Sequence, residues 1–186
     1  TAGVDTQSNQ HASRSAPPSG VYSNWQQDAE IEQKGLFAEL VYQLNDNGKI
    51  ASGYRLDQWQ ATDLRPMVGN MMSMKPNPSY NQERDDNLHS VFARYEHQLT
   101  DKPLTAYVGA GSTERFPDYW EMIAKESQMT VSAFNVAPEH TKQIDTGLLF
   151  ADEKRQWSAS VFYNQIDDFI LVDYRSMMKM QGFVRN

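Results

Sequence analysis

The sequence predicts an all-β chain whose long antiparallel strands form one segment of a transmembrane β-barrel. Three observations favour this fold class. Residues 36–57 form a hairpin pattern with one largely apolar face and one polar face, three hairpins with short turns are joined by much longer connections, and the strands exceed those of soluble sheets. Barrel strands present one face to lipid and one to a wet interior, with short turns at one end only. A soluble β-sandwich with irregular loops is the alternative interpretation.

The clearest hairpin covers residues 36–57, which read LFAELVYQL, NDNGK and IASGYRLD. Its apolar side chains recur at every second position, and a period of two is typical of a β-strand. The central Asn and Gly residues accept positive φ at little cost, so NDNGK is expected to be a tight turn. The polar face carries Glu39 and Arg55, and we expect these side chains to form a salt bridge across the hairpin.

The remaining elements follow the same reasoning along the chain. Residues 1–26 are polar and are expected to form a loop, and long irregular segments are expected at about 63–87 and 116–137. Six strands are expected at about Glu30–Leu44, Lys49–Thr62, Leu88–Leu99, Leu104–Arg115, Glu139–Phe150 and Gln156–Tyr174. On the fourth strand Leu104, Ala106, Val108 and Ala110 are predicted to face lipid, and Thr105, Tyr107 and Gly109 the interior.

The composition and net charge of the chain exclude several classes of structure and function. The 186 residues are long enough for one domain, and a mean hydropathy of -0.69 leaves no stretch suited to a transmembrane helix. The net charge of -7 argues against a nucleic-acid partner. The absence of cysteine excludes disulfides, zinc–thiolate sites and cysteine nucleophiles. The chain begins in polar sequence without an initiator methionine, so we expect a part of a longer protein.

Three motifs resemble the C-terminal barrel half of TonB-dependent outer-membrane receptors. They are RFPDYWE at 115–121, PEHTKQIDTGL at 138–148 and VFYNQIDDFI at 161–170, and the likeness extends over about Glu30–Tyr174. RFPDYWE together with DDFILVDYR is most similar to the copper receptors of that family. The resemblance implies that residues 1–186 are part of one domain, a 22-stranded barrel with short periplasmic turns and long extracellular loops. The family's plug domain, TonB box and final barrel strand are expected to lie outside this sequence.

The methionines of the chain also indicate copper as the substrate. Seven of the nine methionines gather in two predicted outer loops: Met67, Met71, Met72 and Met74 in one, and Met177, Met178 and Met180 in the other. Thioether sulfur is a soft ligand that selects Cu(I) over hard cations. His11 is a candidate to add an imidazole. Apolar filling by flexible side chains is the competing interpretation of the methionines.

No catalytic motif accompanies these features. Asp167 and Asp168 are adjacent on a strand, so they point to opposite faces and cannot share a substrate. We therefore expect a transporter and not an enzyme, with copper as transported substrate and not as resident cofactor. The resemblance implies an outer-membrane location, contact with lipid, and coupling to the TonB complex through the N-terminal part. An iron-siderophore receptor and, more remotely, a soluble glycan-binding sandwich are the alternatives.

Overall fold

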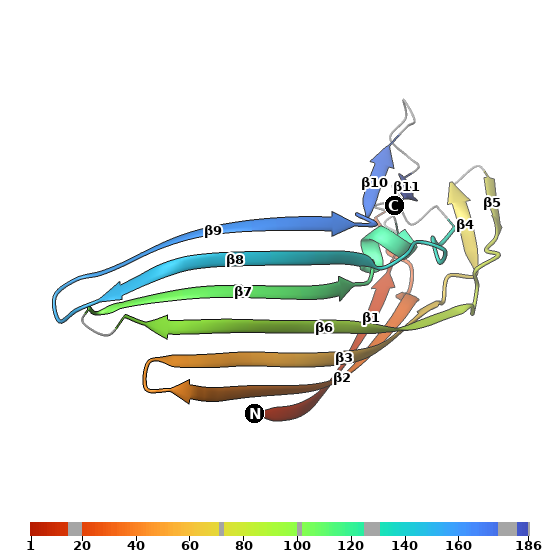
Figure 1. Ribbon diagram of the computed structural model, residues 1–186. Coiled ribbons are helices and arrows are strands. Elements are labelled where there is room, and N and C mark those ends of the chain that lie inside the picture. The colour runs from red at the N-terminus through yellow and green to blue at the C-terminus, as the bar shows by residue number, and fades with distance from the viewer. Residues whose placement is uncertain (15–19, 71–72, 100–101, 125–130, 175–181, 186) are drawn as a thin grey trace.

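A seven-stranded antiparallel sheet makes up most of the structure (Figure 1). This computed structural model describes residues 1–14, 20–70, 73–99, 102–124, 131–174 and 182–185. In sheet order the strands are β1 (Ala2–Ser13), β2 (Gln26–Asn45), β3 (Gly48–Asp63), β6 (Glu83–Gln98), β7 (Leu104–Arg115), β8 (Glu139–Ala151) and β9 (Gln156–Asp167). Two small hairpins stand apart from the sheet: β4 (Met67–Asn70) with β5 (Ser73–Pro76), and β10 (Leu171–Tyr174) with β11 (Gly182–Arg185).

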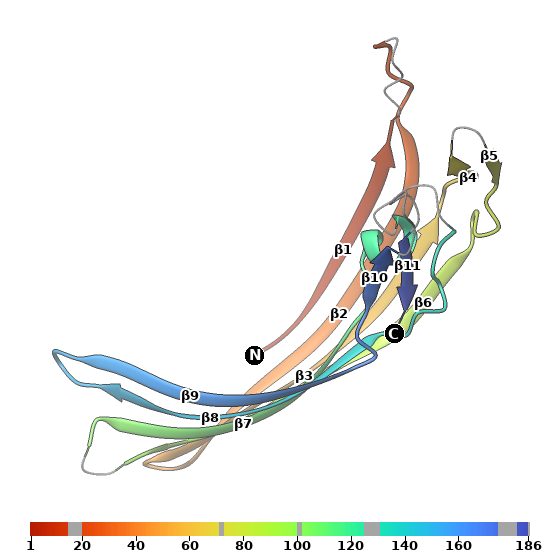
Figure 2. The same cartoon turned by 90° about the horizontal axis from the view of Figure 1, so that it is seen from above.

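The strands follow one another in chain order and curve along their length (Figure 2). Tight turns join them at one end of the sheet, as at Asn45–Gly48, where the Asn47 N–H donates to Asn45 Oδ1 over 3.0 Å. Long connections join them at the other end, and both small hairpins lie there (Figure 1). Short turns at one end and long loops at the other confirm the predicted barrel pattern. Among the described residues, no helix has the length and apolar character needed to cross a membrane.

Strand β1 was not predicted. Residues 1–26 were expected to be a loop, yet Ala2–Ser13 pair antiparallel with β2 from Ala2–Ala38 to Ser13–Gln26. The sheet therefore has seven long strands where six were expected. The segment is rich in Ser, Asn and Gln and lacks the apolar alternation that signals a strand. Its backbone is ordered by the exposed edge of β2, which offers a full row of hydrogen-bonding groups.

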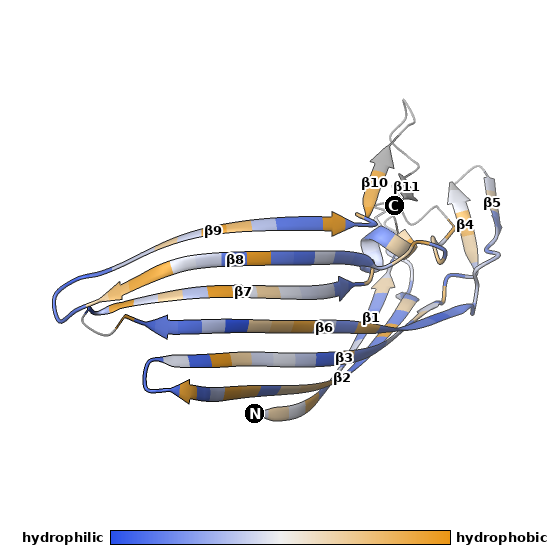
Figure 3. Cartoon of the chain, viewed as in Figure 1, coloured by the Kyte–Doolittle hydropathy of each residue, from blue (hydrophilic) through white to orange (hydrophobic). Residues whose placement is uncertain are grey.

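The two faces of the sheet differ in character. Ladder partners share a face, so the apolar series of the first hairpin continues across all the strands. Blue and orange segments alternate along the strands in Figure 3. Many side chains of the apolar face remain open: Leu40 is 63% exposed, Val161 72% and Tyr163 68%. A continuous, solvent-accessible apolar face on a curved sheet matches a wall that contacts lipid. Leu104, Ala106, Val108 and Ala110 belong to it, as predicted.

On the opposite face, aromatic rings lie over glycines of the neighbouring strand. Phe37 covers Gly3, and a Cβ added to Gly3 would lie 2.7 Å from Phe37 Cζ. Phe92 covers Gly53 in the same way, and Tyr107 covers Gly147. The missing side chains let the rings lie flat against the backbone. This face holds a shallow hollow of about 600 Å³.

The expected salt bridge between Glu39 and Arg55 does not form. Both residues lie on the polar face, as predicted, but they are not ladder partners: Glu39 is opposite Gly53, and Arg55 is opposite Phe37. The Arg55 guanidinium instead binds Asp5 on β1, at 2.7 Å, and Asp57 on its own strand, at 2.5 Å. The unpredicted strand supplies one partner, and a residue two positions along the same face supplies the other.

Candidate metal site at the long-loop end

The connection between β7 and β8 folds back over the polar face of the sheet. The Phe116 ring stacks on Trp59 of β3, with ring centroids 4.1 Å apart and planes 13° from parallel. The short π-helix η1 (Trp120–Ala124) adds fully buried Met122 and Ile123. The cluster is completed by Ala29, Ala61, Leu88, Tyr119 and Ala124. We call residues 116–124 and 131–136 the cap, because they cover the sheet at its long-loop end.

Polar contacts hold the start of the cap. The Glu121 N–H donates to Asp118 Oδ1 over 2.8 Å, and the Asp118 N–H donates to Glu121 Oε2 over 2.9 Å. This reciprocal pair satisfies backbone donors that a helical turn leaves free. Arg115, at the end of β7, donates to Glu121 and also to Glu139 at the start of β8. The RFPDYWE motif thus combines an aromatic core with its own anchoring charges.

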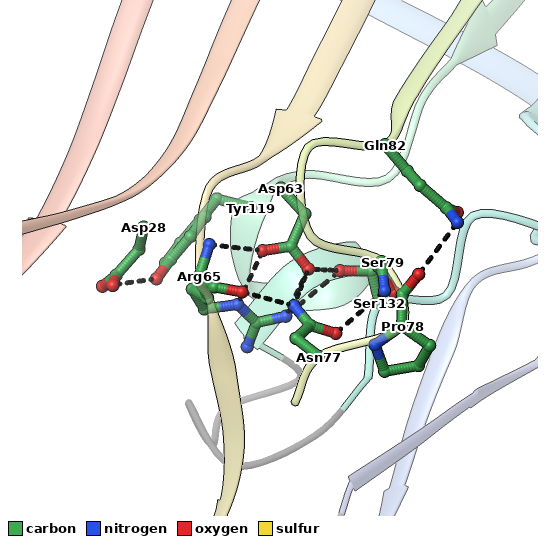
Figure 4. Close-up of polar contacts among 9 residues, drawn as sticks. All are labelled: Asp28, Asp63, Arg65, Asn77, Pro78, Ser79, Gln82, Tyr119 and Ser132. Atoms are coloured by element: carbon green, nitrogen blue, oxygen red, sulfur yellow. Dashed lines mark hydrogen bonds and ion pairs between the residues drawn. The ribbon is translucent and has the colours of Figure 1, made fainter. Parts of the chain in front are cut away.

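A buried polar cluster joins the cap to the β4–β5 hairpin (Figure 4). The Asp63 carboxylate, fully buried at the end of β3, accepts hydrogen bonds from three side chains: Arg65 Nε and Nη2 at 3.0 and 2.9 Å, Asn77 Nδ2 at 2.9 Å, and Ser132 Oγ at 2.5 Å. Arg65 Nη2 also donates to Ser132 Oγ over 3.1 Å. We call Asp63, Arg65, Asn77 and Ser132 the Asp63 clasp.

The hydrogen-bond donors of the clasp favour the ionised form of the Asp63 carboxyl group. Burial raises the pKa of the Asp63 carboxyl, but the hydrogen bonds from Arg65, Ser132 and Asn77 outweigh burial, and the pKa lies below its ordinary value. Arg65 is itself 2% exposed, so the ion pair is almost dry. Removing one partner of such a pair leaves an unpaired buried charge, which is costly.

The β4–β5 hairpin presents two methionines on one side. Met67 is opposite Pro76 and Met74 is opposite Gly69, which places both methionines on the same face of the ribbon as diagonal neighbours. Their side chains are 39% and 54% exposed, whereas Val68, on the other face, is 1% exposed. Gly69 has a φ of 128°, a backbone conformation that favours glycine, and a Cβ added there would collide with the Ser73 carbonyl oxygen. Two thioethers are therefore presented together to solvent.

His11 lies on β1 and not on a loop, because of the unpredicted pairing with β2. Its ring stacks on Tyr119 of the cap, with centroids 4.0 Å apart and planes 2° from parallel. His11 is opposite Ala29, which is opposite Asp63, so His11 and Asp63 face the same side about 10 Å apart. The structure thus places the imidazole against Tyr119 of the cap, on the same face as Asp63 and two strands away from it.

The structure describes only some of the predicted metal ligands. Met71, Met72, Met177, Met178 and Met180 are outside the described residues. The strands that flank the two methionine groups, β4–β5 and β10–β11, lie at the same end of the sheet, as expected (Figure 1). Within the described part of the chain, no three His, Asp or Glu side chains gather as a metal site. Hydroxyl groups contact the other histidines: His89 by Tyr54, His97 by Tyr95 and His140 by Ser112.

Sequence reasoning missed the clasp. Asp63 and Arg65 fall where a strand was expected to end, and Asn77 and Ser132 fall in segments that were expected to be irregular. Asn77-Pro78-Ser79 does carry a local signal, since Asn side chains next to proline commonly bond to backbone two residues on. The Ser79 N–H does donate to Asn77 Oδ1 over 3.0 Å. The contact with Ser132 has no such signal.

The family model for the TonB-dependent receptor-like β-barrel matches residues 1–179. The chain belongs to the TonB-dependent receptor family. Among solved structures, the copper transporter OprC superposes with a TM-score of 0.87 at 35% sequence identity. The alignment covers 100% of this chain and 30% of that protein, so the chain spans under a third of its relative's length. No curated protein sequence matches.

Family membership orients the structure. In such receptors the short turns face the periplasm and the long loops face outward. The cap, the Asp63 clasp and the β4–β5 hairpin therefore form part of the outer mouth of the receptor barrel. We therefore predict that the face that carries Arg55 and Phe92 lines the lumen and that the face that carries Val108 and Tyr163 contacts lipid.

Proposed function

We propose that this chain is part of an outer-membrane TonB-dependent receptor that imports copper. The likeness over the whole chain to a protein described as a copper transporter carries the proposal. The exposed pair Met67 and Met74 on one ribbon face gives it a chemical basis, because thioethers favour Cu(I). The cargo is a substrate, and the TonB complex would act through the N-terminal part of the receptor.

The ligands we propose are those of the methionine loops, Met67, Met71, Met72 and Met74, with Met177, Met178 and Met180 from the second loop. His11 would add an imidazole farther down, beneath the cap. Capture at the outer mouth would be followed by movement of the loops over the lumen and displacement of the plug. A site built on sulfur predicts tighter binding of Cu(I) than of Zn(II) or Fe(II), whereas an imidazole- or carboxylate-rich site would hold Zn(II) well.

The test replaces Met71, Met72 and Met74 together by Ile in the full-length receptor, which keeps apolar bulk and removes sulfur. We expect the purified triple variant to lose Cu(I) loading while its barrel stays folded. Met122→Leu is the matched control, since Met122 is fully buried in the cap and its replacement removes a sulfur away from the hairpin. Unchanged copper content in the triple variant would show that these methionines are apolar filler. Preferential binding of an iron-siderophore would instead favour the alternative cargo.

A further inference from the structure

The base of the methionine hairpin is closed by one buried residue. Asn77, just after β5, donates its backbone N–H to the Pro66 carbonyl over 2.9 Å and its side-chain amide to the Arg65 carbonyl over 2.8 Å. Asn77 also donates to Asp63 Oδ2. The chain leaves the barrel at Arg65 and Pro66 and returns at Asn77. Asn77 therefore joins the two ends of the hairpin, at the point where the chain leaves the sheet and returns to it.

The same carboxylate ties this base to a second, distant connection. Ser132, in the cap, donates to Asp63 Oδ2 and accepts from Arg65. The cap itself rests on the sheet through the Trp59–Phe116 stack, and the Ala133 N–H donates to the Met122 carbonyl over 2.7 Å. Contacts from β3, the hairpin base and the cap thus converge on Asp63. A shift of the hairpin relative to the cap requires these buried hydrogen bonds to break.

The clasp is centred on the last residue of β3, where the ladder of the barrel wall ends. Pairing of β3 with β6 ends at Thr62–Glu83, one residue before Asp63, while pairing with β2 ends at Ala29–Asp63 itself. The buried Asp63–Arg65 ion pair, with Asn77 and Ser132 as neutral donors, thus links two outer connections to the end of β3.

We propose that the Asp63 clasp positions the β4–β5 hairpin over the receptor mouth, so that Met67 and Met74 are held in place for metal capture. Asp63, Asn77 and Ser132 are positioning residues, acting through the hairpin and not as ligands. The proposal rests on the proposed copper function and adds what sets the affinity of the site. Ligands held by buried hydrogen bonds bind metal more tightly than ligands on a loose loop, because less conformational entropy is lost on binding.

The experiment uses the full-length receptor with Asp63→Asn, Asn77→Ala and Ser132→Ala as separate variants. Ser132→Ala leaves the Asp63–Arg65 pair intact, so it tests the tie to the cap without leaving a buried charge unpaired. Asp152→Asn is the matched control, because Asp152 pairs with Arg155 in a turn at the opposite end of the same sheet. Spin labels on cysteines at Lys75, on the hairpin, and at Gln58, on the barrel wall, report the position of the hairpin. Unfolding in denaturant reports the barrel.

We expect the clasp variants to broaden the distance distribution between the two labels and to weaken Cu(I) affinity by about tenfold or more, the range seen when groups that support metal ligands are lost. Asn77→Ala and Ser132→Ala should leave the unfolding of the barrel unchanged, and the Asp152→Asn control should change neither measurement. Asp63→Asn leaves the buried Arg65 charge unpaired, so it should also lower the stability of the barrel. A narrow, unchanged distribution in Asp63→Asn and Asn77→Ala would overturn the proposal. So would a broadened distribution with unchanged copper affinity in a receptor whose Met67→Ile and Met74→Ile variants do lose copper. If those methionine variants keep copper as well, the proposed function itself fails, a result distinct from a failure of the clasp.

Discussion

Val108→Arg tests the assignment of the two faces of the sheet most directly. Val108 lies on the apolar face between Tyr95 of β6 and Thr146 of β8, and its side chain is 49% exposed. Along the strand, the apolar series begins at Leu104 and gives way to Ser112. Each of these is four residues from Val108, which is about 13 Å along the strand or about 9 Å of depth at a 45° tilt. Val108 therefore lies near the middle of the lipid-facing band.

A guanidinium at that depth cannot reach water without bending the chain or thinning the bilayer. Its cost at the midplane of a barrel is about 2–4 kcal/mol, and it falls toward zero at the interfaces. We therefore expect Val108→Arg to lower the free energy of unfolding by about that amount. The assay is a denaturant titration of the full-length receptor refolded into lipid vesicles, with the folded fraction followed by tryptophan fluorescence.

Gln143→Arg provides the matched comparison. Gln143 lies on the neighbouring strand β8, opposite Gly111 and Asn164, on the face that points to the lumen. An arginine there stays in a wet environment, so we expect a change of about 0.5 kcal/mol or less, as for most surface substitutions. Equal losses in the two variants, or a larger loss for Gln143→Arg, would refute the assignment of lipid and lumen faces.

Two further predictions concern the lumen face and the outer mouth. A Cβ added at Gly53 would lie 3.0 Å from Phe92 Cζ, so Gly53→Ala should cost about 1–3 kcal/mol in the same titration, and Phe92→Ala in the double variant should recover part of the loss. A result in which the two losses simply add would contradict this packing. Because hydrogen bonds hold the pKa of Asp63 below its ordinary value, the clasp is stable above that value and weakens as the pH falls through the folded-state pKa. The protection factors of amides in the β4–β5 hairpin, which compare each measured exchange rate with the intrinsic rate at the same pH, should therefore fall below about pH 4 in the wild type, with no such step in Asp63→Asn.

Local periodicity was sufficient for most of the barrel wall. Leu104–Arg115 was predicted with the bounds of β7, and the predicted strand Glu139–Phe150 ends one residue before β8 does. Alternation of side chains along a strand is a local property, since successive residues point to opposite faces of the sheet. Because one face of the sheet contacts lipid and the other contacts water, this alternation appears in the sequence as alternating apolar and polar residues. The family motifs added the orientation of the two ends.

Contacts between distant residues were decided by the tertiary structure. Ala2–Ser13 has no apolar alternation and becomes a strand only because β2 offers an edge, and the partner Asp5 of Arg55 comes with it. The clasp likewise joins Asp63 to Ser132 across 69 positions of sequence. The sequence by itself determined the strands whose apolar side chains alternate and the side that each of their residues faces, because both follow from a period of two. The folded barrel decides which polar segment pairs with the edge of β2 and which donors reach the Asp63 carboxylate. Both depend on segments that are far apart in the sequence, so no local pattern encodes them.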